Sequence, residues 1–417
     1  MAAPAPDNDV TVPGWTPSYE WKAVLLLTLG FGLVGLDRWI IAPLAPAMIG
    51  DLGMTPQDVN NLVAVLGVAW GVSAVLMGGL SDRIGRRRVL IPSIVFFSLM
   101  SGFSGMATGF LALFAVRAMM GVAEGAFCPT SFAATAEASK PSRRGFNQGL
   151  QQATFALFGL GFGPIIATQL LQHVGWREVF LLVAIPGLIV ALLLWLVIRE
   201  PRFIAEKAAR AADAEPVPAA SLGELFAHRN VGLGMASLLC AMCGIFVLSA
   251  NIPLYLTESL GLSPTDMGLV TSAIGFGGFA GQWGLPALSD IFGRRPMAVA
   301  GFVLGAVFLW FFMQVGAEPG MLFVLLFLSC AFSFGLLALI TGPIATEAAP
   351  PGRISTTAGI IIGSGEIFGG GLALVVAGAV IAAYGIDSML YLALGGLLAG
   401  CVLTPFLRET APRRTGR

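Results

Sequence analysis

The chain is a succession of apolar runs, each long enough to cross a lipid bilayer. Of its 417 residues, 56% are hydrophobic and only 11% are charged. A helix needs about 20 apolar residues to cross about 30 Å of hydrocarbon, and its backbone groups must be hydrogen-bonded within the segment. We therefore predict transmembrane helices rather than strands, and the composition excludes a water-soluble globule.

Twelve runs meet this description. They span residues 21–43, 61–80, 89–109, 111–135, 146–171, 178–198, 231–256, 267–288, 296–316, 320–346, 355–382 and 386–407. The predicted fold class is an all-α integral membrane protein with twelve transmembrane helices.

The distribution of Lys and Arg predicts the orientation, because these residues are retained in short cytoplasmic loops. One set of alternate connections carries nearly all of them, whereas the other set carries only Arg177. We therefore expect both termini in the cytoplasm of a multi-pass plasma membrane protein, with a bacterial inner membrane as the expected location. The polar, acidic residues 1–20 lack the pattern of a cleavable secretory signal.

The longest connection separates six helices from six. Residues 199–230 have the composition of a surface helix followed by a stiff linker with Pro216 and Pro218. The predicted parts are a cytoplasmic tail 1–20, a bundle 21–198, a cytoplasmic linker 199–230, a bundle 231–407 and a cytoplasmic tail 408–417.

The two halves share a repeated loop sequence. The stretch from Gly78 to Arg87 recurs in weaker form from Pro286 to Arg295, and each copy joins the second and third helix of its half. Glycine permits a tight turn, the arginines hold it in the cytoplasm, and the aspartate lies at a helix end where it can accept hydrogen bonds.

This repeat resembles the loop signature of the major facilitator superfamily, and the resemblance covers the whole chain. It implies two six-helix bundles related by a pseudo-two-fold axis, a substrate site near the midplane and rocking between inward-open and outward-open states. The motif residues would then belong to the gating machinery, although helix capping and membrane topology also explain them. They are Gly78, Asp82, Arg83, Gly85, Arg86 and Arg87 in the first half and Asp290, Gly293 and Arg294 in the second.

Five ionisable residues lie within the apolar runs: Asp37, Arg38, Arg117, Glu124 and Glu366. Charge at this depth is costly, so such residues usually face a water-filled pathway and pair with one another or with a ligand. At about 1.5 Å of rise per residue, their predicted depths overlap, at roughly 10 to 24 Å from the cytoplasmic edge. A static ion network between helices 1 and 4 is the structural alternative, but fewer charges would suffice for it.

The spacing of these charges predicts their relative directions. Arg117 and Glu124 are seven residues apart, so they share a helix face but lie too far apart for direct contact. We expect another group between them. Asp37 and Arg38 are consecutive and point about 100° apart, so they must meet different partners.

Two segments are similar to the anion:cation symporter family within the superfamily. They are Leu36-Asp37-Arg38 with the later Asp51-Leu52-Gly53-Met54-Thr55, and the stretch from Arg117 to Phe127. The resemblance implies that Arg38 and Arg117 contact an organic anion and that Asp37 and Glu124 carry the coupling proton. Trp70 departs from the family, in which many members have an aromatic hydroxyl in helix 2.

The chemistry of these residue types agrees with such roles. A guanidinium stays charged and offers a bidentate fork to a carboxylate, while a carboxyl group in a medium of low dielectric constant can bind and release protons.

Four further residues are candidates for the substrate site. Glu366 lies in a glycine-rich stretch and has three alternative roles. It takes part in substrate or proton handling, it pairs with an arginine of the other bundle to form a gate, or it forms an interhelical hydrogen bond as the neutral acid. Asn251 and Gln282 can supply hydrogen bonds from the second bundle. Gln151, with Gln152, is a candidate for facing the cavity, although a cytoplasmic helix end explains both.

The predicted function is import of a small organic anion, a sugar acid or other carboxylate, by proton symport. One alternative is an aromatic acid:proton symporter. Another is a proton-coupled antiporter that exports drugs or metabolites, because Gly159 to Pro164 partly resembles the signature of drug:proton antiporters; a kinked, closely packed helix also explains this stretch. A channel, a sensor and a membrane enzyme are disfavoured.

No catalytic group, metal site or cofactor is expected. Cys240 and Cys243 form C-x-x-C within an apolar run without further ligands, and His173 and His228 lack a nucleophile or metal partner. The basic residues are explained as signals of membrane topology with weak attraction to anionic lipid, so nucleic acid is not an expected partner. The expected partners are the organic anion, protons and membrane lipid, with the protein acting as a monomer.

Overall fold

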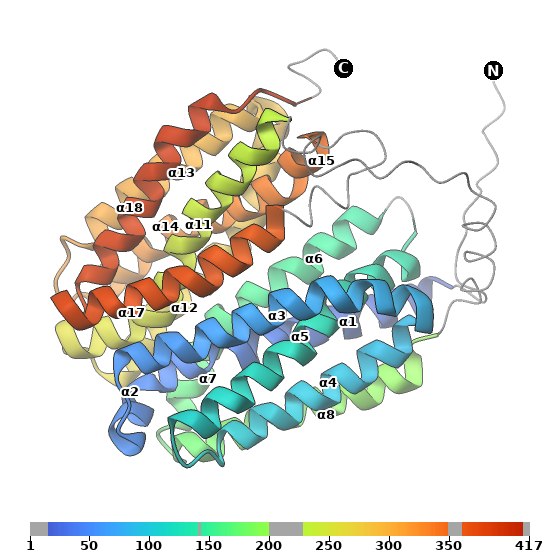
Figure 1. Cartoon of the computed structure of the whole chain (residues 1–417), viewed down its shortest axis with the longest axis horizontal. Coiled ribbons are helices and arrows are strands. Elements are labelled where there is room, and N and C mark those ends of the chain that lie inside the picture. The colour runs from blue at the N-terminus through green and yellow to red at the C-terminus, as the bar shows by residue number, and fades with distance from the viewer. Residues whose placement is uncertain (1–15, 141–142, 200–227, 349–360, 412–417) are drawn as a thin grey trace.

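The structure is a computed structural model of the whole chain, and it describes residues 16–140, 143–199, 228–348 and 361–411. In this part of the chain every regular element is helical, and the helices form twelve rods (Figure 1). The predicted all-α membrane fold is confirmed. Nine rods are long and apolar enough to cross a membrane by length and composition. The other three, described below as α3, α4 and α12, pack among them.

The first half contains six rods. Two consist of more than one element, and four are single helices. In chain order they are α1 (Pro17–Trp39) with α2 (Ile41–Leu52), α3 (Pro56–Ile84), α4 (Arg86–Ser104), α5 (Phe110–Ala138), α6 (Arg144–Ala156) with the π-helical η2 (Leu157–Phe162) and α7 (Gly163–Leu170), and α8 (Trp176–Val197).

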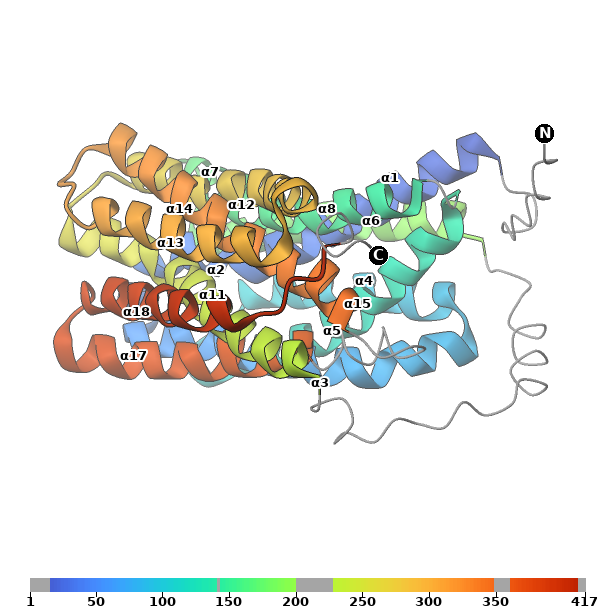
Figure 2. The ribbon, with the colours of Figure 1, turned by 90° about the horizontal axis from the view of Figure 1, so that it is seen from above.

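The second half also contains six rods. They are α11 (Arg229–Leu254) with η3 (Tyr255–Ser259), α12 (Pro264–Phe292), α13 (Arg294–Phe312), α14 (Pro319–Leu339) with η4 (Ile340–Ile344) and α15 (Ala345–Ala348), η5 (Gly365–Leu372) with α17 (Ala373–Tyr384), and α18 (Ser388–Leu403) with η6 (Thr404–Phe406). The helices of the first half lie together in the lower part of Figure 1 and those of the second half in the upper part, while in Figure 2 the two halves overlap at the end where they pack together.

The first rod differs from its predicted bounds at both ends. Thr16 caps α1, so the helix begins four residues before the predicted start at 21. Glu20, predicted to lie in the polar tail, is fully buried because Arg143 and Asn147 bind its carboxylate. At the other end the rod continues through α2 to Leu52. The predicted linker 199–230 falls almost entirely outside the described residues.

The repeated loop adopts the same backbone in both halves. Gly85 joins α3 to α4 with φ of 106°, and Gly293 joins α12 to α13 with φ of 102°. This left-handed region favours glycine, so the repeated glycine has a conformational reason. The helix ends near these loops carry most of the arginines, and we call this face the basic side and the opposite face the far side.

The two bundles meet along the middle and far parts of their helices. α12 packs against η2 and α7, α17 and η5 pack against α3, and α11 packs against α2. At the closest approach, a Cβ atom on Gly275 of α12 would collide with the backbone of Leu160 and Gly161 in η2. The glycine at 275 therefore allows the bundles to approach backbone to backbone.

We expect Gly275→Ala to lower the thermal unfolding temperature of the detergent-solubilised protein, because overpacking a tight contact costs about 1–3 kcal/mol. Gly284→Ala, on the same helix with nothing within 4 Å of the added Cβ, is the matched control and should unfold like the unmodified protein. Equal unfolding temperatures for the two variants would contradict the proposed close approach.

Candidate functional site

The first rod is interrupted where its two charged residues lie. α1 ends at Trp39, and Ile40 separates it from α2. Asp37 and Arg38 occupy the last turn before this break. The last carbonyls of a helix lack partners within it, so those of Asp37 and Arg38 can accept hydrogen bonds from a side chain of another helix.

Arg117 of α5 binds these carbonyls. Its Nη1 donates to the carbonyl oxygen of Asp37 at 2.8 Å, and its Nη2 donates to that of Arg38 at 2.7 Å. The side chain is completely buried and is not among the residues that line the cavity described below. In this conformation Arg117 positions the broken helix, and its predicted contact with the anion stays a prediction.

Asp37 and Arg38 point to different partners, as their spacing predicts. The carboxylate of Asp37 accepts a hydrogen bond from the Ser101 hydroxyl of α4 at 2.7 Å. Arg38 instead reaches across to the second bundle, where its Nη2 lies 3.4 Å from Oε2 of Glu366. One residue thus faces the interior of its own bundle and the other faces the interface between bundles.

Glu124 of α5 is fully buried near the same group. It interacts electrostatically with Asp37, Arg38 and Arg117. Among the described residues, neither of its carboxyl oxygens has a hydrogen-bond partner. Because a buried ionised carboxylate without a donor is costly, this arrangement suits the neutral acid.

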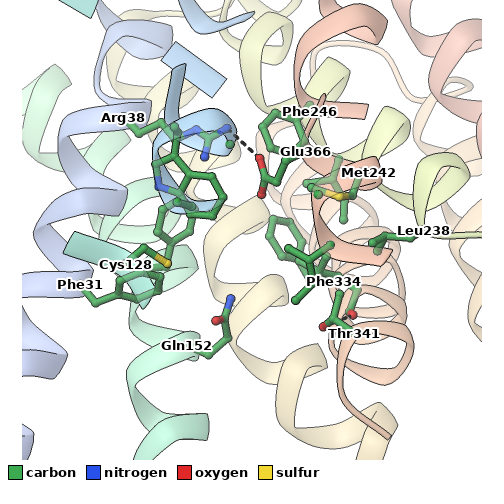
Figure 3. Close-up of a pocket in the computed structure, with 18 of the residues that line it drawn as sticks. Phe31, Arg38, Cys128, Gln152, Leu238, Met242, Phe246, Phe334, Thr341 and Glu366 are labelled. Carbon is green, nitrogen blue, oxygen red and sulfur yellow. Dashed lines mark hydrogen bonds and ion pairs between the residues drawn. The ribbon is translucent and has the colours of Figure 1, made fainter. Parts of the chain in front are cut away.

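A cavity of about 360 Å³ lies between the bundles. It is shown in Figure 3, with Phe31, Cys128 and Gln152 on one side and Met242, Phe334 and Thr341 on the other. Both bundles line it. The first half contributes Phe31, Arg38, Trp39, Trp70, Gly71, Ala74, Cys128, Pro129, Phe132, Gln152 and Phe155, and the second contributes Leu238, Met242, Ile245, Phe246, Gln282, Phe334, Leu337, Thr341, Ile362, Gly363 and Glu366.

The guanidinium of Arg38 is enclosed by aromatic rings in the wall of this cavity. The ring centroids of Phe246, Trp39, Trp70 and Phe155 lie 4.9, 5.8, 5.8 and 6.0 Å from its Cζ. These faces attract a cation and exclude water from it. The site therefore combines one fixed positive charge with a mostly apolar wall, which suits an organic anion with a substantial apolar part.

Of the three neutral residues predicted to bind substrate, one lines the cavity and two lie elsewhere. Gln282 lines the cavity. Gln151 does not line it: its amide accepts from Thr135 at 2.6 Å and donates to Ser131 at 2.8 Å within the first bundle, while the neighbouring Gln152 lines the cavity.

Asn251 lies on the far side of the cavity, where it pairs with Asn60 of α3. The two side-chain amides exchange hydrogen bonds of 2.8 and 3.0 Å, and both residues are fully buried. This pair joins the two bundles beyond Arg38. Sequence reasoning missed Asn60, which directly precedes the predicted run 61–80.

The loop motif residues form matching ion pairs on the basic side. Arg86 binds Ser81 and lies 3.0 Å from Glu137, and Arg294 binds Ser289 and lies 2.9 Å from Glu347. Each pair stays within one bundle. The two glutamates were missed, although each lies one or two residues after a threonine near the end of the fourth helix of its half.

The remaining motif residues have individual contacts. Arg87 donates to the carbonyl of Trp195, and Asp290 lies 2.6 Å from Arg294. The side chains of Asp82 and Arg83, together with Gly78, fall outside what the structure describes.

The segment after α18 contacts the same motif. Burial tends to raise the pKa of Glu409, but backbone N–H groups of Ala411, Arg294 and Arg295 outweigh this effect and hold its pKa below the usual value. The ionised carboxylate of Glu409 therefore caps the start of α13.

Comparisons with known proteins identify the family. The Major Facilitator Superfamily model matches residues 27–258 and 234–417. A Haemophilus influenzae protein named for metabolite transport is 29% identical over 391 residues, covering 90% of this chain and 92% of its own.

Further relatives have more specific names. The probable 4-methylmuconolactone transporter of Cupriavidus pinatubonensis is 27% identical, with 82% of this chain and 79% of that protein covered. The hexuronate transporter of Bacillus subtilis is 26% identical, with 78% and 73% covered. Among solved structures, an inward-facing, unoccupied bacterial homolog of human Spinster matches with a TM-score of 0.67 at 18% identity, covering 94% of this chain and 95% of its own.

We expect Arg117→Lys to lower the thermal unfolding temperature, because an ammonium cannot bind both carbonyls in the geometry of the guanidinium fork. Losing one charged hydrogen bond costs about 1.5–3 kcal/mol. The exposed Arg408 supplies the control, Arg408→Lys, which should leave unfolding unchanged. A variant Arg117→Lys that unfolds normally but no longer binds an anion would instead support direct substrate contact.

Proposed function

The chain belongs to the major facilitator superfamily, and we propose that it imports a small organic anion, a sugar acid or other carboxylate, together with protons by alternating access. The superfamily's members are transporters rather than enzymes. The proposal specifies three things beyond the family: an anionic substrate, coupling to protons and uptake into the cytoplasm. Each is argued below from a separate feature.

Arg38 carries the anion assignment. Among the described residues that line the cavity it is the only basic side chain, and it is 1% exposed. A buried guanidinium that faces a cavity needs an anion or an acidic partner. A carboxylate that enters the cavity finds there a charge-assisted donor within an apolar wall, which is the basis of strong and specific binding.

Asp37 and Glu124 support the coupling to protons. Both are buried in the first bundle beside Arg117 and Arg38, and neither lines the cavity. A carboxyl group in such a place changes charge only by binding or releasing a proton. Their protonation therefore alters the charge near the bound anion without competing for its space.

The position of the cavity supports uptake by alternating access. The Asn60–Asn251 pair closes the far side, while Phe132 and Thr341, both in the cavity wall, lie closer to the basic side. The positive-inside rule places the basic side in the cytoplasm. The arrangement then corresponds to an inward-facing state from which the anion leaves into the cytoplasm.

The aromatic wall favours an aromatic acid as the second candidate. Seven aromatic side chains line the cavity, and its polar side chains are few: Arg38, Gln152, Gln282, Thr341 and Glu366 besides the thiol of Cys128. A polyhydroxylated acid would leave most of its hydroxyl groups without partners against such a wall, at a cost for each. An aromatic acid instead stacks on the rings.

An antiporter has weaker support in the geometry. The glycine-rich stretch of the fifth rod, which keeps this alternative open, packs closely on two helices. Cβ atoms at Gly159 and Gly161 would meet α1 and α12 respectively. Close packing therefore accounts for these glycines.

Uptake into liposomes tests the proposal. With an inward-directed proton gradient, we expect radiolabelled benzoate or glucuronate to accumulate, and a protonophore to abolish the accumulation. Arg38→Ala should lower the initial rate about tenfold or more, because a charged hydrogen bond contributes about 1.5–3 kcal/mol. Arg408→Ala, which removes an exposed arginine, should transport normally.

Two results would contradict this reading. One is gradient-driven extrusion of cations or neutral compounds without anion uptake. The other is normal anion transport by Arg38→Ala.

Glu124→Gln should separate binding from coupling, because the amide fills the same space but binds no proton. We expect exchange of labelled for unlabelled anion across the liposome membrane to persist, while uphill uptake is lost. Glu178→Gln, at an exposed position in the same bundle, is the control. Uphill uptake by Glu124→Gln at the normal rate would exclude Glu124 from proton coupling.

A further inference from the structure

Glu366 binds the guanidinium nitrogen of Arg38 that a substrate carboxylate would bind. Its Oε2 accepts from Nη2 of Arg38 at 3.4 Å, and Figure 3 shows the pair bridging the two walls of the cavity. Among the described lining residues Glu366 is the only acidic one. Its side chain is 12% exposed, so it remains accessible from the cavity while that of Arg38 is 1% exposed.

The space around this pair is tightly limited. A Cβ atom on Gly67 would lie 3.1 Å from Nη2 of Arg38, and one on Gly370 would lie 3.2 Å from Oε2 of Glu366. Aromatic rings cover the remaining faces of the guanidinium. An incoming carboxylate that binds Nη2 must therefore take the place of Glu366.

The charges of the buried group give a second constraint. It contains two guanidinium groups, Arg38 and Arg117, and three carboxyl groups, Asp37, Glu124 and Glu366. One proton on the carboxyl groups makes the empty site neutral. A bound monoanion adds one negative charge, so a second proton is needed to restore neutrality in this medium of low dielectric constant.

We propose that Glu366 is the internal counterion of Arg38, that the substrate anion displaces it, and that Glu366 takes up a proton when it is displaced. The inference rests on the proposed function, since it requires an anion at Arg38. The proton comes from water in the cavity and is held on a carboxyl oxygen of Glu366. When the anion and proton leave, the ion pair with Arg38 forms again.

The local structure permits this displacement. Glu366 lies in η5, a π-helical segment with glycines at 365, 369, 370 and 371. Such segments are irregular and are frequent at functional sites. Glu366 shares the cavity wall with Gln282, whose carbonyl oxygen has no partner among the described residues.

Few titratable groups surround Glu366. From α1 it faces Arg38, and from α5 the thiol of Cys128 is near enough to interact with it electrostatically. α3 presents Gly67, Val68 and Gly71 beside η5, and α11 presents Leu238, Met242 and Phe246. The described groups of α11 that titrate nearest to η5 are the thiols of Cys240 and Cys243. Arg38 therefore dominates the charge that Glu366 senses.

Anion affinity as a function of pH tests the proposal. Binding of benzoate and of glucuronate to the purified protein is measured by titration calorimetry from about pH 5.5 to about pH 8.5, where both probes remain anions. In the unmodified protein we expect Kd to rise by up to about tenfold per pH unit as Glu366 ionises. In Glu366→Gln the dependence of Kd on pH should be weaker, because only Asp37 and Glu124 can still contribute to it, and the affinity should be stronger at the upper end.

Two further variants serve as controls for this test. Glu258→Gln, at an exposed position in the same half, should retain the pH dependence of the unmodified protein. Glu366→Asp keeps the charge at a weaker pairing distance, so it should bind the anion more tightly with the pH dependence retained. In unbuffered solution, adding anion should cause proton uptake by the unmodified protein and less by Glu366→Gln.

The possible outcomes distinguish failure of the proposed function from failure of the proposed role of Glu366. If neither anion binds the unmodified protein, the proposed function fails, and this inference with it. If Glu366→Gln keeps the original pH dependence, the coupled proton resides elsewhere. If Glu366→Gln binds no anion at any pH while remaining folded, Glu366 holds the substrate instead of competing with it.

Discussion

Arg117 fastens the broken first rod to α5, and the geometry of the site follows from this attachment. Its two hydrogen bonds fix the carbonyls of Asp37 and Arg38. With the backbone held there, the Asp37 side chain points to Ser101 and the Arg38 side chain points to the other bundle. Burying a guanidinium costs several kcal/mol, and charged hydrogen bonds of about 1.5–3 kcal/mol each offset that cost. An arginine is suited to this position because its fork binds two carbonyls at once.

Apart from the pair Arg38–Glu366 at the cavity, the pairs described on the basic side and on the far side differ in kind. On the basic side the ion pairs Arg86–Glu137 and Arg294–Glu347 stay within one half each. Across the far side the described pair Asn60–Asn251 is neutral, and each of its hydrogen bonds contributes about 0.5–1.5 kcal/mol net. Charged pairs thus hold each half together as a unit, while an uncharged pair, which separates at lower cost, closes one end of the interface.

The sequence predicted the features that depend on local pattern. The twelve rods follow from apolar runs, and the repeated glycines at 85 and 293 have the backbone that their loop position implies. The different directions of Asp37 and Arg38 follow from helical periodicity. The partner of Arg38 in the empty site was not predicted, because pairing across bundles depends on tertiary packing. A pair with an arginine of the other bundle was one of the three alternatives for Glu366.

Other features depend on packing that no single segment encodes. Arg117 binds backbone carbonyls, which have no residue-specific signal in the sequence. Gln151 and Gln152 are adjacent, and a π-helical segment beginning five residues later changes the helical phase of this rod, so periodicity alone does not decide which one lines the cavity. Asn60 was missed because its importance depends on Asn251, 191 residues away.

The pair between Arg38 and Glu366 relates substrate binding to the movement of the bundles. It is a charged link between the two halves, placed at the cavity rather than at either end. An anion that takes the place of Glu366 removes this link, since the anion neutralises Arg38 within the first half. Apolar packing and neutral hydrogen bonds then hold the bundles together. Separating them costs less than separating a buried ion pair, which would leave each charge without its partner. Without an anion, the link reforms and restrains the empty transporter. The pair Arg38–Glu366 therefore couples anion binding to the rocking of the two halves. This agrees with the general rule that a ligand shifts a conformational equilibrium only when it interacts unequally with the two conformations.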